Sequence, residues 1–352
     1  MLIKDLCIIN PKSINKNFQF INYIDTSSVV DGTLLEVQNL TNNYPSRAKR
    51  ELVNDDILIS SVRPNLKHNY YVHCNYKNLI GSTGFIQIRV NSNEVHPKYL
   101  YYFLTNEKQV KKYTSVAETS QTTFPSFNKD VIENIEFPNI SYENQVHIVN
   151  TIGSIDNLIE NLNKIKDKLH EFVSVRLKNE PSSIKLLGDY INIYDNIRKP
   201  LSSMERTGEK IYPYYGATGI LDYVSNYIFD DEYVLLAEDG SVMNNEEKPI
   251  IQYINGKTWV GNHAHVLKAT NGLTLYSLYF ILKDTNVKNA VTGAVQMKIN
   301  QSNLKKINIK LPIEIKKINK FTESVMNEII IINNKLINLN NLKQQYLKKF
   351  FG

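Results

Sequence analysis

The sequence predicts a mixed α/β (α+β) fold, built as two similar halves that each end in one long helix. Three observations lead to this prediction. Several stretches repeat in the same order, apolar stripes at helical spacing close each half, and short apolar runs between turn residues indicate strands. The expected order is a globular part at 1–141, a helix at 142–178, a second globular part at 179–313 and a second helix at 314–352.

The repeat is clearest just before the two long helices. TFPSFNKDVIENIEFPNI resembles QMKINQSNLKKINIKLPIEI, and Pro138 matches Pro312 across a shift of 174 residues. Earlier in each half, DDILISSVRP, which ends at Pro64, resembles DEYVLLAEDG, which ends at Gly240, and HPKYLYYFL resembles TLYSLYFIL. An ordered series of matches at a nearly constant shift indicates a tandem duplication.

Each half ends in a segment whose apolar residues recur at spacings of three, four or seven, which places them on one face of a helix. The first segment, 142–177, has 36 residues and would be about 54 Å long at about 1.5 Å per residue. We expect the two stripes to pack against each other as a coiled coil. The alternative is that each helix packs only on its own domain. The expected seam residues are Ile152, Ile155, Ile159, Leu162, Leu169, Val325, Ile329 and Leu336.

Short runs rich in apolar and β-branched residues, bounded by turn residues, predict the strands of the globular parts. The order of these strands within a sheet does not follow from the sequence. The expected strands are 57–60, 85–90, 233–237, 250–254 and 265–268, and the expected short helices are 98–104 and 275–282.

Composition limits the classes of protein to consider. The chain has 352 residues, a formal net charge of +6 and 42% hydrophobic residues, which permits two packed domains and nucleic-acid binding without establishing the latter. Its two cysteines make a disulfide framework improbable and favour a reducing compartment. No apolar run approaches the roughly 20 residues of a membrane span, and the first residues do not resemble a secretion signal. We therefore expect a cytoplasmic protein with no membrane partner.

The sequence offers little chemistry for catalysis. The glycine-rich stretch 215–219 lacks the G-x-G-x-x-G spacing of a cofactor loop and is typical of a turn. A P-loop and the motif of adenine methyltransferases are both absent from the sequence. Asp231 and the later EEK at 246–248 match a nuclease pattern loosely, but Pro249 follows directly and indicates a turn. We expect no catalytic residue and no cofactor.

His263 and His265 are the best candidates for a metal site. Residues two apart on a strand face the same side, so both imidazoles could bind one ion with Glu238 or Asp239. The interpretation we favour is a hydrogen-bonded histidine pair that shapes the domain or its DNA-facing surface. No metal is therefore expected.

Recognition chemistry is better represented than catalysis. Arginine, lysine, asparagine and glutamine are suited to phosphates and base edges, and they gather in PSRAKRE, SVRPNLKH and the polar segments before the repeated prolines. The alternative is that these segments are ordinary solvated loops. The expected contacts are Arg47, Lys49, Arg63, Asn65, Lys67, Gln121 and Thr122 in the first half and Gln296 and Lys298 in the second.

At this point the sequence resembles the specificity subunits of type I restriction–modification systems. The resemblance covers essentially the whole chain. It rests on FINYIDTSSVVDG, YPSRAKRELVNDDILISSVRPNLK and ETSQTTFPSFNKDVIENIEFP in the first half. In the second half it rests on LGDYINI, IYPYYGATGILDYV, YVLLAEDGS, WVGNHAHVL and TGAVQMKINQSNLKKINIKLP. Within these segments Tyr215, Thr218, Ser241 and His263 join the expected DNA contacts.

The resemblance implies a specific architecture and role. It implies two target-recognition domains separated by two antiparallel helices, each domain reading one half of a split site in double-stranded DNA. It also implies docking of two adenine-N6 methyltransferase subunits on the helices, with two ATP-dependent restriction subunits joining in some complexes, and no activity of the chain alone. Two alternatives stay open: a related system whose partner fuses methylation and cleavage in one chain, and an interaction protein that binds no DNA.

Overall fold

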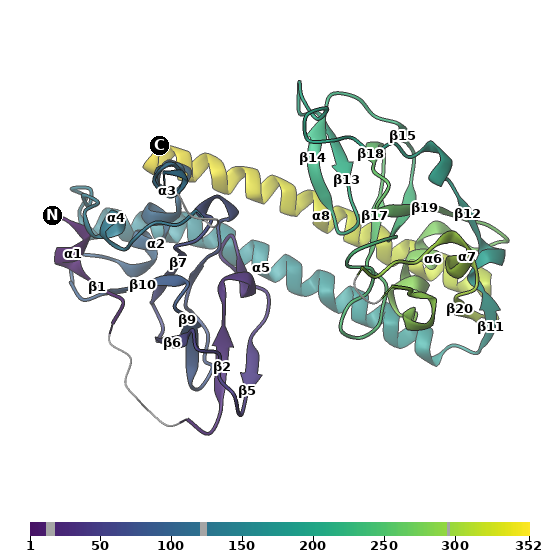
Figure 1. Cartoon of the computed structure of the whole chain (residues 1–352), viewed down its shortest axis with the longest axis horizontal. Coiled ribbons are helices and arrows are strands. Elements are labelled where there is room, and N and C mark those ends of the chain that lie inside the picture. The colour runs from purple at the N-terminus through teal and green to yellow at the C-terminus, as the bar shows by residue number, and fades with distance from the viewer. Residues whose placement is uncertain (12–17, 120–124, 294–295) are drawn as a thin grey trace. The chain divides into compact units, whose positions relative to one another are not determined.

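The computed structural model describes residues 1–11, 18–119, 125–293 and 296–352. The chain divides into two compact units (Figure 1). The first unit comprises 1–160 and 337–352, and the second comprises 161–336. Each unit therefore contains part of both long helices, α5 (Tyr142–Asn179) and α8 (Ile315–Phe351). The mixed α/β class predicted from the sequence is confirmed.

Two four-stranded sheets form the globular part of the first unit. One has the order β1-β10-β7-β8 and is antiparallel throughout, and the other has the order β5-β2-β9-β6 with β2 parallel to β9. β7 is buried along its whole length because it lies between two neighbours. The elements are α1 (Ile3–Leu6), β1 (Cys7–Ile9), β2 (Ile21–Ile24), β3 (Val29–Val30), β4 (Thr33–Leu34), β5 (Gln38–Leu40), β6 (Ala48–Glu51), β7 (Ile57–Ser60), β8 (Asn69–Tyr71), β9 (Leu79–Ser82), β10 (Phe85–Val90), α2 (Pro97–Thr105), α3 (Glu107–Glu118) and α4 (Asp130–Glu133), with short 3-10 turns at Thr26–Ser28 and Pro64–Leu66.

The second unit repeats this topology. Its sheets have the orders β12-β19-β16-β17 and β14-β13-β18-β15, and β13 is parallel to β18 as β2 is to β9. The elements are β11 (Ser182–Leu186), β12 (Ile191–Ile193), β13 (Tyr212–Tyr215), β14 (Ile220–Val224), β15 (Phe229–Asp230), β16 (Tyr233–Ala237), β17 (Ile251–Ile254), β18 (Lys257–Val260), β19 (Ala264–Ala269), α6 (Leu275–Lys283), α7 (Gln301–Lys305) and β20 (Asn308–Pro312), with 3-10 turns at Leu187–Tyr190, Asp195–Ile197 and Lys288–Ala290.

Most of the predicted elements are confirmed. The strands expected at 57–60, 85–90 and 233–237 have those bounds, whereas those expected at 250–254 and 265–268 are β17 and the longer β19. The helices expected at 98–104 and 275–282 lie within α2 and α6. α3, which follows α2 directly, has no predicted counterpart, because its single apolar face is short and its composition is polar.

The two long helices pack against each other within each unit. In the second unit Val173 of α5 contributes to a buried cluster with Val325 and Ile329 of α8. Among the expected seam residues, Ile152, Ile155, Val325, Ile329 and Leu336 are buried, and Ile159, Leu162 and Leu169 are half-buried.

Polar contacts show the direction of the helix pair. Lys166 is 3.5 Å from Asn333 in the second unit, and Asp156 is 2.8 Å from Lys343 in the first. Residue numbers on α8 thus fall as those on α5 rise, which is the register of an antiparallel pair.

A polar clamp joins the first turn of α5 to the start of α2. The Gln145 side chain is fully buried, and its Oε1 accepts the backbone N–H of His96 at 2.8 Å. Its Nε2 donates to the backbone oxygen of Glu94 at 2.8 Å. One amide therefore satisfies a donor and an acceptor of the chain that leads into α2.

The second unit contains the same clamp at the equivalent place in α8. Asn319 Oδ1 accepts the backbone N–H of Thr274 at 3.1 Å, and its Nδ2 donates to the oxygen of Gly272 at 2.7 Å. Asn319 lies 174 residues after Gln145, the shift found between the repeated prolines. The duplication thus extends to single hydrogen bonds.

Candidate nucleic-acid interface

In the first unit, backbone hydrogen bonds hold four segments of the chain together beyond the end of β7. Ser61 N donates to the oxygen of Gly84 at 3.0 Å, and Ser61 accepts from Phe127 N at 3.0 Å. Arg63 N donates to the oxygen of Pro125 at 2.9 Å, and Thr83 N donates to Arg47 at 2.9 Å. We call residues 47–50, 61–68, 82–84 and 125–127 the first loop cluster.

The second unit repeats three of these backbone bonds beyond the end of β16. Glu238 N donates to the oxygen of His263 at 2.9 Å, the oxygen of Glu238 accepts from Ile299 N at 2.8 Å, and Gly240 N donates to the oxygen of Met297 at 3.0 Å. A further bond, from Gly261 N to the oxygen of Tyr215 at 3.0 Å, lies on the β13 side of β18, whereas the bond from Thr83 to Arg47 lies on the β6 side of β9. We call residues 215–219, 238–241, 261–263 and 296–298 the second loop cluster.

The matching bonds define which residues of the two clusters are equivalent. Ser61 takes the place of Glu238, and Arg63 takes the place of Gly240. The sequence comparison set Pro64 against Gly240, so it was out of step by one residue. The error arose because letter similarity aligned the strands without the loop hydrogen bonds that fix the register.

The structure brings most of the predicted contact residues into these two clusters. Arg47, Lys49, Arg63 and Asn65 are exposed and Lys67 is half-buried in the first, and Thr218, Ser241, His263, Gln296 and Lys298 are exposed and Tyr215 half-buried in the second. Gln121 and Thr122 lie outside the described residues. Their role as contacts stays a prediction, as does that of the others.

Two cationic residues of the first cluster have a left-handed backbone. Arg63 has φ 48° and ψ 60°, and Lys67 has φ 53° and ψ 37°, on either side of the turn Pro64–Leu66. This conformation costs a non-glycine residue about 1–2 kcal/mol. The equivalent of Arg63 is Gly240, which adopts φ 76° without that cost. The first unit therefore keeps a charged side chain where glycine would be the easier residue.

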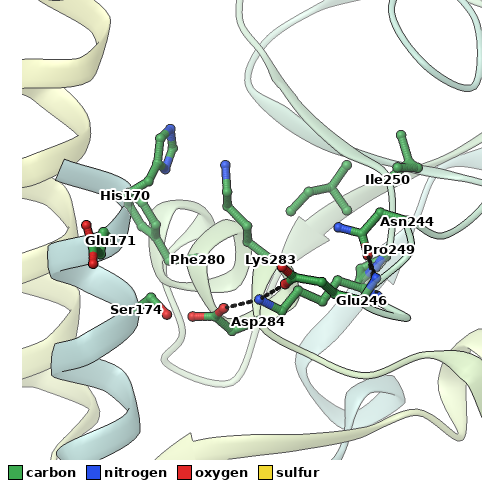
Figure 2. Close-up of a pocket in the computed structure, with 12 residues that line it drawn as sticks. His170, Glu171, Ser174, Asn244, Glu246, Pro249, Ile250, Phe280, Lys283 and Asp284 are labelled. Carbon is green, nitrogen blue, oxygen red and sulfur yellow. Dashed lines mark hydrogen bonds and ion pairs between the residues drawn. The ribbon is translucent and has the colours of Figure 1, made fainter. Parts of the chain in front are cut away.

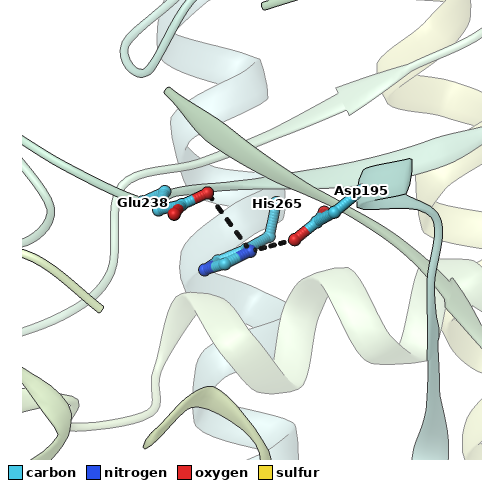
Figure 3. A group of neighbouring side chains, drawn as sticks. All are labelled: Asp195, Glu238 and His265. Carbon is cyan, nitrogen blue, oxygen red and sulfur yellow. Dashed lines mark hydrogen bonds and ion pairs between the residues drawn. The ribbon is translucent and has the colours of Figure 1, made fainter. Parts of the chain in front are cut away.

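A buried ionic network lies beside the second cluster (Figure 3). His265 is fully buried, with Nδ1 2.6 Å from Asp195 Oδ2 and Nε2 2.7 Å from the oxygen of Ile299. Both neighbours are oxygen atoms that accept hydrogen bonds, so each ring nitrogen of His265 faces an acceptor. Asp195 is the acidic partner of the ring.

Asp195 is held ionised by its neighbours. Burial by itself would raise the pKa of this carboxyl group, but hydrogen bonds from His265, Val266 N and Gln301, together with the charge of His265, bring the pKa below its ordinary value. Arg198 also lies 3.2 Å from Asp195 and 2.7 Å from Glu238. The network ties β12, β16 and β19 together.

Asp195, Glu238 and His265 lie close enough to suggest a metal site, because their ligand atoms are all within 4.8 Å of one another. The donor set does not fit an ion, since both nitrogens of His265 already face oxygen acceptors and Arg198 forms ion pairs with both carboxylates. Lys298 adds a second cation, 3.2 Å from Glu238. The group is a structural ion network.

The two histidines of the HAH segment do not share a partner. His263 is exposed and its Nδ1 lies 2.7 Å from Asp239, whereas His265 faces Asp195. The same-side argument fails because β19 begins at Ala264, so His263 is not on the strand. Sequence reasoning missed Asp195 and Arg198, which are distant in sequence and arrive through the pairing of β12 with β19.

The second unit also contains a cleft of about 410 Å³ (Figure 2). Burial lowers the pKa of His170 to about 4, and its buried Nδ1 has no hydrogen-bond partner. Lys248 is 2.8 Å from Glu246 and 3.2 Å from Asp284. The lining thus combines a neutral imidazole with neutralised charges, and it does not assemble a nucleophile with a general base.

The family model for the type I restriction modification DNA specificity domain matches this chain twice, at residues 1–171 and 179–341. The chain belongs to this family. Each match covers one repeat with a long helix, as the duplication predicts. Across the described residues of this specificity-domain protein, no helix is long and apolar enough to cross a membrane.

Individual relatives carry the same description. A putative type I restriction enzyme specificity subunit of Haemophilus influenzae is 37% identical over 141 residues, which are 40% of this chain and 36% of the relative. The HindI type I restriction enzyme specificity subunit of the same organism is 26% identical over 175 residues, 48% of this chain and 38% of the relative. The matches thus span less than two fifths of either relative.

A solved structure supports the fold of the specificity-domain protein. The S subunit of a type I restriction–modification system from M. genitalium superposes with a TM-score of 0.54 at 18% sequence identity, covering 100% of this chain and 95% of that one. The similarity in fold therefore extends over the whole architecture described above.

Proposed function

We propose that this chain is the sequence-reading, non-catalytic subunit of a type I restriction–modification complex. In this proposal 1–141 and 179–313 are the two target-recognition domains, and the helices at 142–178 and 314–352 are the spacers. Each loop cluster contacts one half of a split site in double-stranded DNA. One observation carries the proposal: the same backbone framework occurs in both units, but it presents different side chains in each.

The chemistry of the two clusters supports DNA contact. The first presents Arg47, Lys49 and Arg63, which suit phosphates and guanine, and the second presents Gln296 and Lys298 next to His263. Arg63 and Lys67 also keep left-handed backbone conformations that favour glycine. Because the side chains of the clusters differ, the two half-sites should differ in sequence.

The long helices supply a surface for partner subunits. Leu158, Ile165 and Phe172 of α5 are exposed, with 52%, 48% and 56% of their surface accessible. They recur every seven residues, a spacing that suits packing against a further helix. We propose that two adenine-N6 methyltransferase subunits dock on the helices, one for each half of the duplicated chain, and that ATP-dependent restriction subunits join the complex.

The test is a base-resolution map of N6-methyladenine in cells with and without this gene, with the partner genes present. We expect a split motif that disappears with the gene. Two further strains carry Arg63→Gly or Lys298→Ala, and each should relax or abolish recognition of one half-site while the other half stays unchanged. Methylation that is identical in all strains would contradict the proposal and favour an interaction protein that reads no DNA.

A further inference from the structure

Three polar side chains meet between α2, α5 and α8 in the first unit. Tyr102 Oη donates to Asp156 Oδ2 at 2.5 Å, and Lys343 Nζ lies 2.8 Å from Asp156 Oδ1. Tyr102 is buried, and the side chains of Asp156 and Lys343 are only 24% and 20% exposed. We call these residues the polar triad. Its two charges are largely withdrawn from water and depend on each other.

The equivalent positions of the second unit are apolar. By the repeat, Phe280 stands for Tyr102, Ile330 for Asp156 and Leu169 for Lys343. Phe280 is buried, and Ile330 and Leu169 pack against the cluster that contains it. We call these residues the apolar triad. The same place in the duplicated architecture thus holds an ion pair in one unit and hydrocarbon in the other.

The neighbouring layer of the helix pair does not differ in this way. Ile152 is buried and Leu347 packs on the same core in the first unit. Their equivalents in the second unit, Met326 and Val173, are both buried in one cluster. This neighbouring layer is therefore apolar in both units, whereas the triads are polar in the first unit and apolar in the second.

A duplicated chain has a general assembly problem, because like halves of two copies can pair in place of unlike halves of one copy. If α5 of a second copy replaced α8 in the first unit, Leu169 would take the place of Lys343 and leave Asp156 without its cation. If α8 of a second copy replaced α5 in the second unit, Lys343 would stand against Phe280 and Ile330. Removing one partner of an ion pair that is largely withdrawn from water is destabilising.

We propose that the two triads determine which helix segments pair. In each unit they favour pairing of α5 with α8, and they disfavour pairing of α5 with α5, or of α8 with α8, from two copies of the chain. The mismatch between the triads is the barrier, and neither the ion pair nor the apolar contact is needed by itself. The inference is independent of what the loop clusters bind, since it concerns only how the chain selects its own helices.

Three full-length variants test this. The first-half variant, Tyr102→Phe with Asp156→Ile and Lys343→Leu, makes both triads apolar. The second-half variant, Leu169→Lys with Phe280→Tyr and Ile330→Asp, makes both polar. The exchanged variant carries all six changes and restores the mismatch in the opposite sense. Because it has twice as many substitutions as either other variant, it controls for effects of substitution alone.

The readout is exchange between two differently tagged copies, co-expressed and purified through one tag, with mass measured by light scattering on a sizing column. We expect the first-half and second-half variants to co-purify the other copy about tenfold or more above the native chain, and the exchanged variant to return toward native. Circular dichroism reports whether each variant folds. If either the first-half or the second-half variant fails to fold, the other of these two decides. If a folded first-half or second-half variant exchanges copies only at the native level, the proposal is overturned.

Discussion

At the scale of residues, the two loop clusters differ most where their backbones are most alike. Arg63 and Gly240 occupy equivalent positions with left-handed φ values of 48° and 76°. The arginine accepts a conformational cost that glycine avoids. A residue of this kind is retained for what its side chain does.

Arg63→Gly separates the conformational cost of the Arg63 backbone from the DNA contact proposed for its side chain. We expect the free energy of unfolding in urea to stay within about 1 kcal/mol of native, because relief of backbone strain offsets the lost side-chain contacts. DNA binding by the assembled complex should fall, and discrimination at the half-site that the first loop cluster contacts should relax. Arg63→Lys is the control and should keep most of the affinity. A glycine variant that binds with native affinity would remove Arg63 from the interface.

Asp195→Asn tests the ionic network of the second unit. The pKa of Asp195 is lower folded than unfolded, so its stabilisation is complete above its unfolded pKa of about 3.9 and disappears as pH falls through the folded value. The asparagine variant should be less stable at pH 7 by about 3 kcal/mol, because it removes the carboxylate that pairs with Arg198 and accepts from Gln301 and Val266 N, and should lose less further stability in acid.

The exposed Asp189 provides the matched control for this change. Asp189→Asn should alter the free energy of unfolding by no more than about 0.5 kcal/mol. Equal stability of the two variants across a pH series would show that the network does not hold the unit together.

At the scale of elements, the long helices are attached to their domains by hydrogen bonds as well as by apolar contact. Gln145→Ala should remove both bonds of the clamp and leave the backbone oxygen of Glu94 and the backbone N–H of His96 without these partners. We expect a loss of about 2–3 kcal/mol in thermal or urea unfolding, with faster amide exchange at the start of α2. Asn144→Ala, at the exposed neighbouring position, should have little effect.

The elements also show how far sequence reasoning extends. β7, β16, α2 and α6 follow from local apolar patterns, and α5 and α8 follow from a stripe that local spacing defines. The sheet orders do not follow, because strands of two to six residues pair over long sequence separations that no local pattern encodes. The contact between Asp195 and His265 could not be predicted for the same reason, since Asp195 reaches His265 only through the pairing of β12 with β19.

At the scale of the whole molecule, the helix pair is both a structural seam and a proposed docking surface. Ile155→Asp combined with Ile329→Asp should abolish folding or assembly, because each places a carboxylate at a position that is 5% or 3% exposed. Leu158→Asp changes a residue that is 52% exposed, and should leave the fold intact while weakening recruitment of the methyltransferase. Sizing chromatography of the reconstituted complex measures both. An intact complex from the double variant would refute the seam.

The division of the chain into units has a consequence for biosynthesis. The second unit is one continuous stretch, 161–336, so all of its residues are synthesised before the last segment of the first unit. The core of the first unit includes Tyr346, Leu347, Phe350 and Phe351 of α8, which are synthesised after every other part of both units. The amino-terminal domain is therefore made first but finished last, and until then the apolar surface that receives these side chains is open to chaperones and to other nascent chains.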